Sequence, residues 1–102
     1  MKRLVWSRAA RADLARIAKY FASTDPRVAD SISERIHAAA EKLLRRDIGR
    51  RVGRMAGIRE KRVLRTRYVL AYAWSEKKEA LIILRVIHTA QNWTSSNWPE
   101  QE

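Results

Sequence analysis

Two apolar stripes at helical spacing, separated by only a few residues, constrain the fold of this chain more than any other feature. Ser7 is a suitable N-cap for the first stripe, which runs through residues 10–21 with basic side chains on its other face. Asp25-Pro26 then supplies a cap and a first-turn proline, and a second stripe continues through residues 29–44. Two helices joined by so short a connection pair as an antiparallel hairpin. We therefore expect a helical hairpin in the first half of the chain.

Strand signals lie on both sides of this hairpin. A short one, residues 3–6, precedes it, and three follow: a charged stretch at 58–64, an alternation of large and small residues at 68–74, and an apolar run at 80–88 that we expect to be central. Arg65-Thr66 is a tight connector between the first two of these three. The sequence therefore predicts an α+β fold of order β-α-α-β-β-β, in which a three-stranded antiparallel meander follows the hairpin and the hairpin covers one face of the sheet.

Composition limits the classes of protein that remain. With 102 residues, of which 46% are hydrophobic, the chain can form one domain, which we place at residues 1–92 with a tail at 93–102 that carries two tryptophans. The sequence contains no cysteine, which excludes disulfide scaffolds and zinc ribbons, and its two histidines are far apart, so we expect no metal and no cofactor. No apolar run approaches membrane-spanning length and no signal peptide precedes the first strand, so we expect a cytoplasmic location without membrane contact.

Positive charge is concentrated in the middle of the chain. The formal net charge is +11, and residues 45–67 alone carry ten Lys and Arg against two Asp and Glu. Glycines at 49, 53 and 57 interrupt this stretch, so residues 46–57 are expected to form a charged loop. A solvated basic face is the ordinary interpretation of such a run. So many like charges repel one another unless something neutralises them, which favours binding of a polyanion or of an acidic protein.

Four stretches of the sequence resemble the RelE/ParE toxins of bacterial type II toxin–antitoxin systems. They are WSRAARADLARIAKYF, GRRVGRMAGIRE, RYVLAYAW and LIILRVIHTAQNW, in an order and at spacings that cover nearly the whole chain. The resemblance implies a toxin held inactive by a cognate antitoxin, an acidic protein that wraps the helices and the basic cleft. It also implies growth arrest through one of two targets. RelE-like members are mRNA interferases, ribonucleases that cut messenger RNA in the ribosome, and ParE-like members inhibit DNA gyrase without being enzymes.

We expect ribosome-dependent mRNA cleavage, with gyrase inhibition as the close alternative and a non-toxic nucleic-acid-binding module as the third. Carried over from the nucleases, the resemblance implies catalytic roles for Arg59, Lys61, Arg85 and His88. The arginines would stabilise the charge of the transition state, Lys61 would act as a base and His88 as an acid. The basic cluster adds candidate substrate-binding residues: Arg50, Arg51, Arg54, Arg62, Arg65 and Arg67. No tyrosine follows the last strand, and the ending Arg85-Val86-Ile87-His88 is more similar to ParE members.

Strand geometry sets a condition on this catalytic set. In a regular strand Arg85 and His88 face opposite sides of the sheet, so the two act together only if a bulge or the end of the strand intervenes. Arg85 either points into an open groove or meets a carboxylate, because an unpaired buried guanidinium is costly. His88 has the alternative of being a hydrogen-bonded edge residue. The whole interpretation depends on one arginine-lined hollow, shared by Arg59, Lys61 and Arg85, that receives a negatively charged target.

Overall fold

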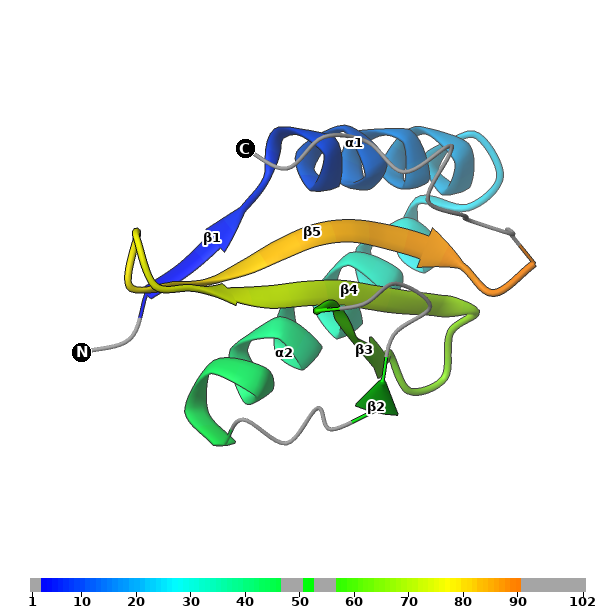
Figure 1. Cartoon of the computed structure of the whole chain (residues 1–102). Helices are drawn as coiled ribbons and strands as arrows, with labels where there is room; N and C mark the ends of the chain where they lie inside the picture. Colours follow the sequence, from blue (N-terminus) through cyan, green and yellow to red (C-terminus); the bar gives the residue numbers. More distant parts are fainter. Residues whose placement is uncertain (1–2, 47–50, 53–56, 91–102) are drawn as a thin grey trace.

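The computed structural model describes residues 3–46, 51–52 and 57–90 of the chain, and Figure 1 shows their arrangement. The sheet lies in front of two helices that both cover one of its faces. In chain order the elements are β1 (Arg3–Trp6), α1 (Arg8–Ala22), α2 (Pro26–Arg46), β2 (Arg51–Val52), β3 (Arg59–Arg62), β4 (Tyr68–Ser75) and β5 (Ala80–His88).

Both helices begin where the sequence predicts. The hydroxyl of Ser7 accepts a hydrogen bond from the backbone N–H of Ala10 at 3.0 Å, which satisfies one of the free donors at the start of α1. Asp25 caps α2 by accepting from the backbone N–H of Arg27 at 3.0 Å, directly after the proline that opens the helix. The helical hairpin is therefore confirmed.

The sheet has the strand order β1-β5-β4-β3-β2, with β1 parallel to β5 and every other pair antiparallel. The predicted α+β architecture is confirmed, and β5 is an inner strand between β1 and β4. The structure adds one strand to the prediction. Within the segment expected to be a loop, Arg51 and Val52 pair with β3, Arg51 opposite Glu60. Two residues are too short to show a strand period, so the sequence pattern gave no sign of β2.

The two faces of the sheet bury different side chains. On the helix side, Ile36 and Leu43 of α2 pack against Leu70 and Ile83 of the sheet. On the other side the buried cluster is formed by Ile58, Ala71, Ala80, Ile82, Leu84 and Ile87. The large residues of β4 lie on the helix side and its small residues on the other, as the alternation at 68–74 predicts.

A bulge interrupts the pairing of β4 with β5. Ala71 lies opposite Arg85 and the next residue, Tyr72, lies opposite Ile83, so β5 holds one extra residue at this point. The extra residue changes the side to which the following side chains point. Ile83 and Val86 therefore lie in the same helix-side cluster although they are three residues apart.

Where β1 ends, residues at the start of α1 form hydrogen bonds with the free edge of β5. The register of β1 ends with Trp6 opposite Ile83, and the next residue, Ser7, donates its backbone N–H to the carbonyl of Ile83 at 3.0 Å. The Ser7 hydroxyl donates to the carbonyl of Leu84 at 2.8 Å. A carboxylate of α1, that of Asp13, accepts from the backbone N–H of Val86 at 2.9 Å. Ser7 and the Asp13 side chain of α1 thus take the place of a strand along the second half of β5.

Candidate functional site

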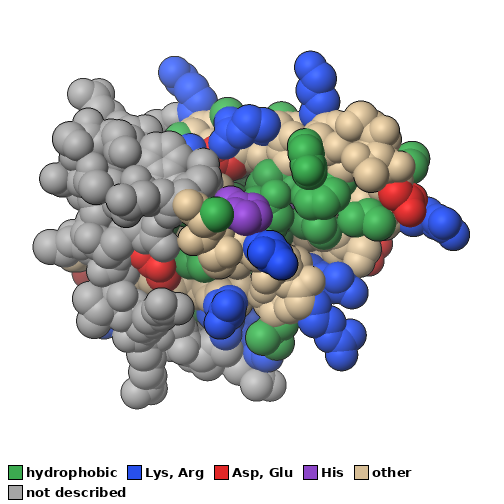
Figure 2. Space-filling model, turned by 90° about the vertical axis from the view of Figure 1, so that its right-hand side faces the viewer, with side chains coloured by type: hydrophobic (Ala, Val, Ile, Leu, Met, Phe, Trp, Pro, Cys, Tyr) green, Lys and Arg blue, Asp and Glu red, His purple; other side chains and the backbone are tan. Residues whose placement is uncertain are grey.

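A cavity of about 600 Å³ lies between the helical hairpin and the sheet, at the end where β5 finishes and β4 begins. It brings together basic and aromatic side chains from α1, from the turn before β4 and from the facing ends of β4 and β5: Arg16, Tyr20, Phe21, Arg65, Arg67, Tyr68 and His88. Figure 2 views this end of the molecule and shows a histidine beside a patch of hydrophobic side chains, with Lys and Arg side chains around them. The cavity can hold a negatively charged group against an apolar wall.

Tyr68 and His88 form the floor of this cavity. Their rings meet edge to face with centroids 5.3 Å apart, and the backbone N–H of Ala90 donates to Nδ1 of His88 at 3.1 Å. Because Nδ1 is an acceptor in that bond, the neutral ring carries its proton on Nε2. Burial raises the pKa of the Tyr68 phenol, the nearby Tyr20 phenol raises it further, and the positive charge of Arg16 partly offsets both. Tyr68 is therefore a neutral hydrogen-bond donor at physiological pH.

Arg16 reaches the cavity from α1 and is held in place by an ion pair with a buried carboxylate. Its Nη2 donates to Oδ1 of Asp13 at 2.5 Å, and the Asp13 side chain is only 1% exposed. The same carboxylate binds Arg85 with two hydrogen bonds, from Nε to Oδ2 and from Nη2 to Oδ1, both 2.8 Å long. One carboxylate thus holds two guanidinium groups and the backbone N–H of Val86. It thereby fixes α1 against the bulge of β5.

The structure decides between the two sequence interpretations of Arg85. Its side chain is 9% exposed and meets a carboxylate, and it does not line an open groove. The bulge precedes Arg85 and the pairing is regular from Arg85 to His88, so the condition set by strand geometry is not met. Arg85 is not among the residues that line the cavity, and Asp13 links it to Arg16, which is.

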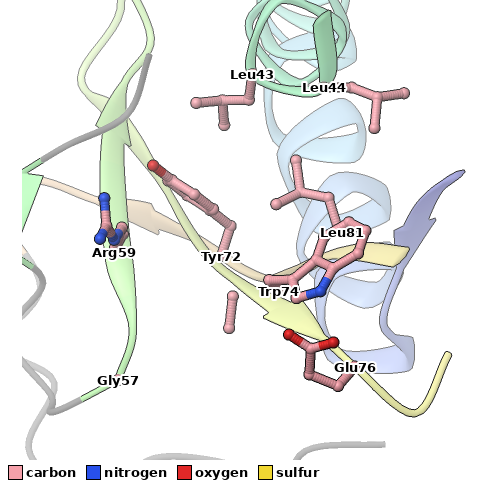
Figure 3. Close-up of a pocket in the computed structure, with 9 residues that line it drawn as sticks. Leu43, Leu44, Gly57, Arg59, Tyr72, Trp74, Glu76 and Leu81 are labelled. Carbon is pink, nitrogen blue, oxygen red and sulfur yellow. The ribbon is translucent and has the colours of Figure 1, made fainter. Parts of the chain in front are cut away.

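Arg59 and Lys61 point to the same side of β3 but line different hollows. They pair with Tyr72 and Leu70, two residues of the helix-side core. Arg59 lines a hollow of about 550 Å³ at the C-terminal end of α2, where Figure 3 shows leucine, tyrosine and tryptophan side chains gathered from α2, β4 and β5. Lys61 lines a hollow of about 220 Å³ beside the middle of α2. The expectation that Arg59, Lys61 and Arg85 share one hollow is wrong, because successive turns of α2 separate the first two and Asp13 sequesters the third.

The remaining candidates of the basic cluster are divided by position. Arg65 and Arg67 line the cavity with His88, and Arg62 lines the hollow of Lys61 together with Arg65. Arg51 belongs to β2, of which only the backbone is described. Arg50, Arg54 and the tail from residue 91 lie outside the described residues.

Among the side chains of this site that sequence reasoning missed are Arg16 and Tyr20. They lie one helical turn apart on α1, on the side of the helix that also carries Asp13 and Ile17. The acidic residue within an otherwise basic helix was the available signal. A lone carboxylate next to a core position of the stripe indicates a buried ion pair.

Over residues 3–46, 51–52 and 57–90, no group of three metal-binding side chains lies close enough to hold an ion. No helix in this part of the chain is long and apolar enough to cross a membrane.

Comparisons with known proteins agree with the sequence resemblance. Residues 4–93 match a family model described as the ParE toxin of the type II toxin–antitoxin system, parDE. No curated protein matches the sequence. Among solved structures, a chain of the chromosomal ParDE toxin–antitoxin system from P. aeruginosa has a TM-score of 0.77 at 22% identity, over 86% of this chain and 96% of that one. A chain of the RelBE2 toxin–antitoxin complex from Mycobacterium tuberculosis has a TM-score of 0.56 at 26% identity, over 85% and 96%.

Proposed function

This chain belongs to the ParE toxin family of type II toxin–antitoxin systems, and from that membership we propose that it arrests growth by inhibiting DNA gyrase, without cutting RNA. The matched residues support the family and the role of toxin. The choice of target rests on the separation of Arg59, Lys61 and Arg85. Cleavage of RNA without a metal needs a base, a cation and an acid within reach of one phosphate. The cation carried over for this role, Arg85, is bound by Asp13 inside the protein.

Messenger RNA cleavage is the second candidate, and one observation favours it. His88, Tyr68 and Arg67 line the same cavity, so an acid and a cation are available together even though Arg59 and Lys61 are elsewhere. In that case His88 would protonate the leaving oxygen and Arg67 would stabilise the negative charge. The sequence favours this target, whereas the ion pair of Arg85 with Asp13 supports gyrase inhibition.

We further propose that a cognate antitoxin, an acidic protein, neutralises the toxin by covering its basic surface. The two structural neighbours come from toxin–antitoxin systems. The formal net charge of +11 gives such a partner its electrostatic complement.

A pair of assays separates the two targets. The purified chain is incubated with gyrase, ATP and relaxed plasmid, and separately with translating ribosomes whose messenger RNA is analysed by primer extension. We expect negative supercoiling to be lost and the messenger RNA to remain intact. Cuts within codons together with normal supercoiling would reverse the proposal. In that event His88→Ala should abolish the cuts, while His37→Ala, which changes the other histidine outside the cavity, should leave them in place.

A further inference from the structure

The hollow at the C-terminal end of α2 is a separate surface, at the far end of the sheet from His88. Side chains from α2, β3, β4 and β5 enclose about 550 Å³ there, and no described residue lines both this hollow and the cavity of His88. The register places Trp74 opposite Leu81 in the hollow and Tyr68 opposite His88 in the cavity. Six residues along β4 separate the two positions, a distance of about 20 Å in a strand. We call this surface the Trp74 hollow.

The indole of Trp74 forms an open wall of this hollow. It is 44% exposed, whereas its cross-strand partner Leu81 is 7% exposed. Arg59 pairs with Tyr72, two residues before Trp74, so the guanidinium and the indole lie on the same face of the sheet. Figure 3 shows them on either side of the Tyr72 ring, with two leucines of α2 above. A large aromatic side chain left open in a hollow lined by core residues is typical of a position that a partner covers.

Charge in the Trp74 hollow is balanced. Its described lining holds one cation, Arg59, and one carboxylate, Glu76, and neither forms an ion pair with another described residue. At the other end of the sheet, the three hollows that Arg65 lines hold eight Lys and Arg side chains and one carboxylate, that of Asp25. The basic end therefore attracts polyanions of any kind, whereas the Trp74 hollow selects a partner by shape and by paired charges.

Recognition of gyrase needs a surface of the second kind. Gyrase acts on DNA, and a basic surface binds DNA phosphates whatever the sequence and whatever enzyme is present. Selection of the enzyme itself therefore has to come from a surface where charges are balanced and apolar area is exposed. Tryptophan, tyrosine and arginine are the residues that contribute most at the centres of protein interfaces, and the Trp74 hollow contains one of each.

We propose that the Trp74 hollow is the surface by which this chain recognises gyrase, an inference that rests on the proposed function. An apolar side chain of gyrase fills the hollow against Trp74 and Leu81. A carboxylate beside it pairs with Arg59, and a cation pairs with Glu76. The basic end of the sheet lies outside this contact, so gyrase and a polyanion can be bound at the same time.

A thiol placed in the hollow reports directly whether gyrase covers it. The sequence contains no cysteine, so a single introduced thiol is the one site of the chain that a maleimide modifies. Glu76→Cys places this thiol in the Trp74 hollow and gives up only one of the proposed contacts. Asp30→Cys is the control, at an exposed position of α2 that lines neither the Trp74 hollow nor the hollows of Arg65. Gyrase should slow modification of Glu76→Cys several-fold, read from the mass of the chain, and should not protect Asp30→Cys.

Affinity for gyrase and inhibition of supercoiling are measured on a second set of variants. Trp74→Ala should weaken both by about tenfold or more, as truncation of a central interface tryptophan does. Trp74→Phe keeps a ring in the hollow and should recover part of this loss. Val28→Ala truncates an apolar side chain of similar exposure, 40%, at the basic end and should change neither quantity. Circular dichroism verifies the fold of each variant, and if Trp74→Ala is unfolded the thiol measurement decides.

The inference is overturned if Trp74→Ala binds gyrase as tightly as Val28→Ala, or if gyrase leaves the thiol of Glu76→Cys as reactive as that of Asp30→Cys. Poly-L-glutamate serves as the probe for an acidic partner, and protection of Glu76→Cys by it as strong as by gyrase would assign the hollow to such a partner instead. A dimer of the unsubstituted chain that Trp74→Ala disperses, measured by light scattering, would assign it to a second copy.

The same measurements separate this inference from the proposed function. If the unsubstituted chain neither binds gyrase nor inhibits supercoiling, the proposed function is wrong and the inference is wrong with it. If the unsubstituted chain does both and Trp74→Ala does them equally well, the function stands and only the assignment of the Trp74 hollow is refuted.

Discussion

Arg85 and Arg65 show two opposite uses of the same side chain within one small sheet. Arg85 is buried between α1 and β5, where both of its hydrogen bonds to Asp13 are 2.8 Å long. Arg65 stands exposed on the turn between β3 and β4, where three hollows meet. Arg85 therefore has a structural role, whereas Arg65 is exposed to solvent.

Burial explains this difference better than charge does. A guanidinium taken out of water needs a carboxylate of good geometry, and once it has one it is no longer available to a ligand. An exposed guanidinium contributes little to stability and retains its capacity to bind. The basic count of the chain therefore overstates the number of arginines that can reach a partner, and the location of each decides its role.

Removing the carboxylate should have the largest effect on stability. Asp13→Ala leaves Arg85 buried without this partner and removes the acceptor of the Val86 N–H, so we expect a loss of about 3–5 kcal/mol in the free energy of unfolding. Urea denaturation followed by circular dichroism measures it. Asp30→Ala, at an exposed position of α2, is the control and should cost little. If Asp13→Ala costs less than about 1 kcal/mol, the ion pair with Asp13 is not what distinguishes the structural role of Arg85 from that of Arg65.

Losing the buried hydroxyl should have an intermediate effect. Ser7 both caps α1 and donates to the carbonyl of Leu84, so Ser7→Ala removes two hydrogen bonds at a buried position. We expect a loss of about 1–2 kcal/mol, measured by the same denaturation. The control is Ser23→Ala, whose hydroxyl contacts an exposed carbonyl at the end of α1. Equal losses for the two serines would contradict the view that the α1–β5 contact is the stabilising region.

Alkaline pH should reveal the burial of Tyr68. Its pKa is raised above the usual 10.0, so the folded state retains the phenolic proton more strongly than the unfolded state does. The stabilising contribution is complete below the unfolded pKa and is lost as pH rises through the folded pKa. Ultraviolet titration should show a late tyrosinate contribution that is smaller in Tyr68→Phe than in Tyr20→Phe. Simultaneous ionisation of all tyrosines at the usual pH would contradict this.

Changing Arg65 should affect stability least. Arg65→Asn alters an exposed side chain on a turn whose φ asparagine tolerates, so we expect a change within about 0.5 kcal/mol in the free energy of unfolding. The thermal midpoint should likewise stay close to that of the unsubstituted chain. A loss as large as that of Ser7→Ala would show that Arg65 supports the fold, and the contrast with Arg85 would then disappear.

Local patterns predicted most of the fold. The caps at Ser7 and Asp25 set the starts of both helices, and the apolar run of residues 80–88 coincides with β5. These features depend on neighbours within one or two turns of the same element. The two-residue strand β2 depends instead on a partner strand, and no local period reports it.

The site was less predictable because it depends on contacts between distant segments. Asp13 and Arg85 are 72 residues apart, so nothing in the last strand alone reveals that its arginine has a partner. The opposite parity of Arg85 and His88 follows from the sequence, but only the register shows that the bulge of β5 precedes Arg85 and leaves this parity unchanged. The meeting of three hollows at Arg65 depends on the packing of α2 against a turn of the sheet.

The hydrogen bonds that α1 makes along β5 have a consequence for behaviour at high concentration. Where β1 stops, a bare strand would offer unpaired donors and acceptors to any second molecule able to extend the sheet, which is a common route to aggregation. At this margin the carbonyls of Ile83 and Leu84 and the N–H of Val86 already have partners in Ser7 and Asp13. The start of α1 thus covers the edge of β5, and weakening this contact should cause the chain to aggregate before it unfolds.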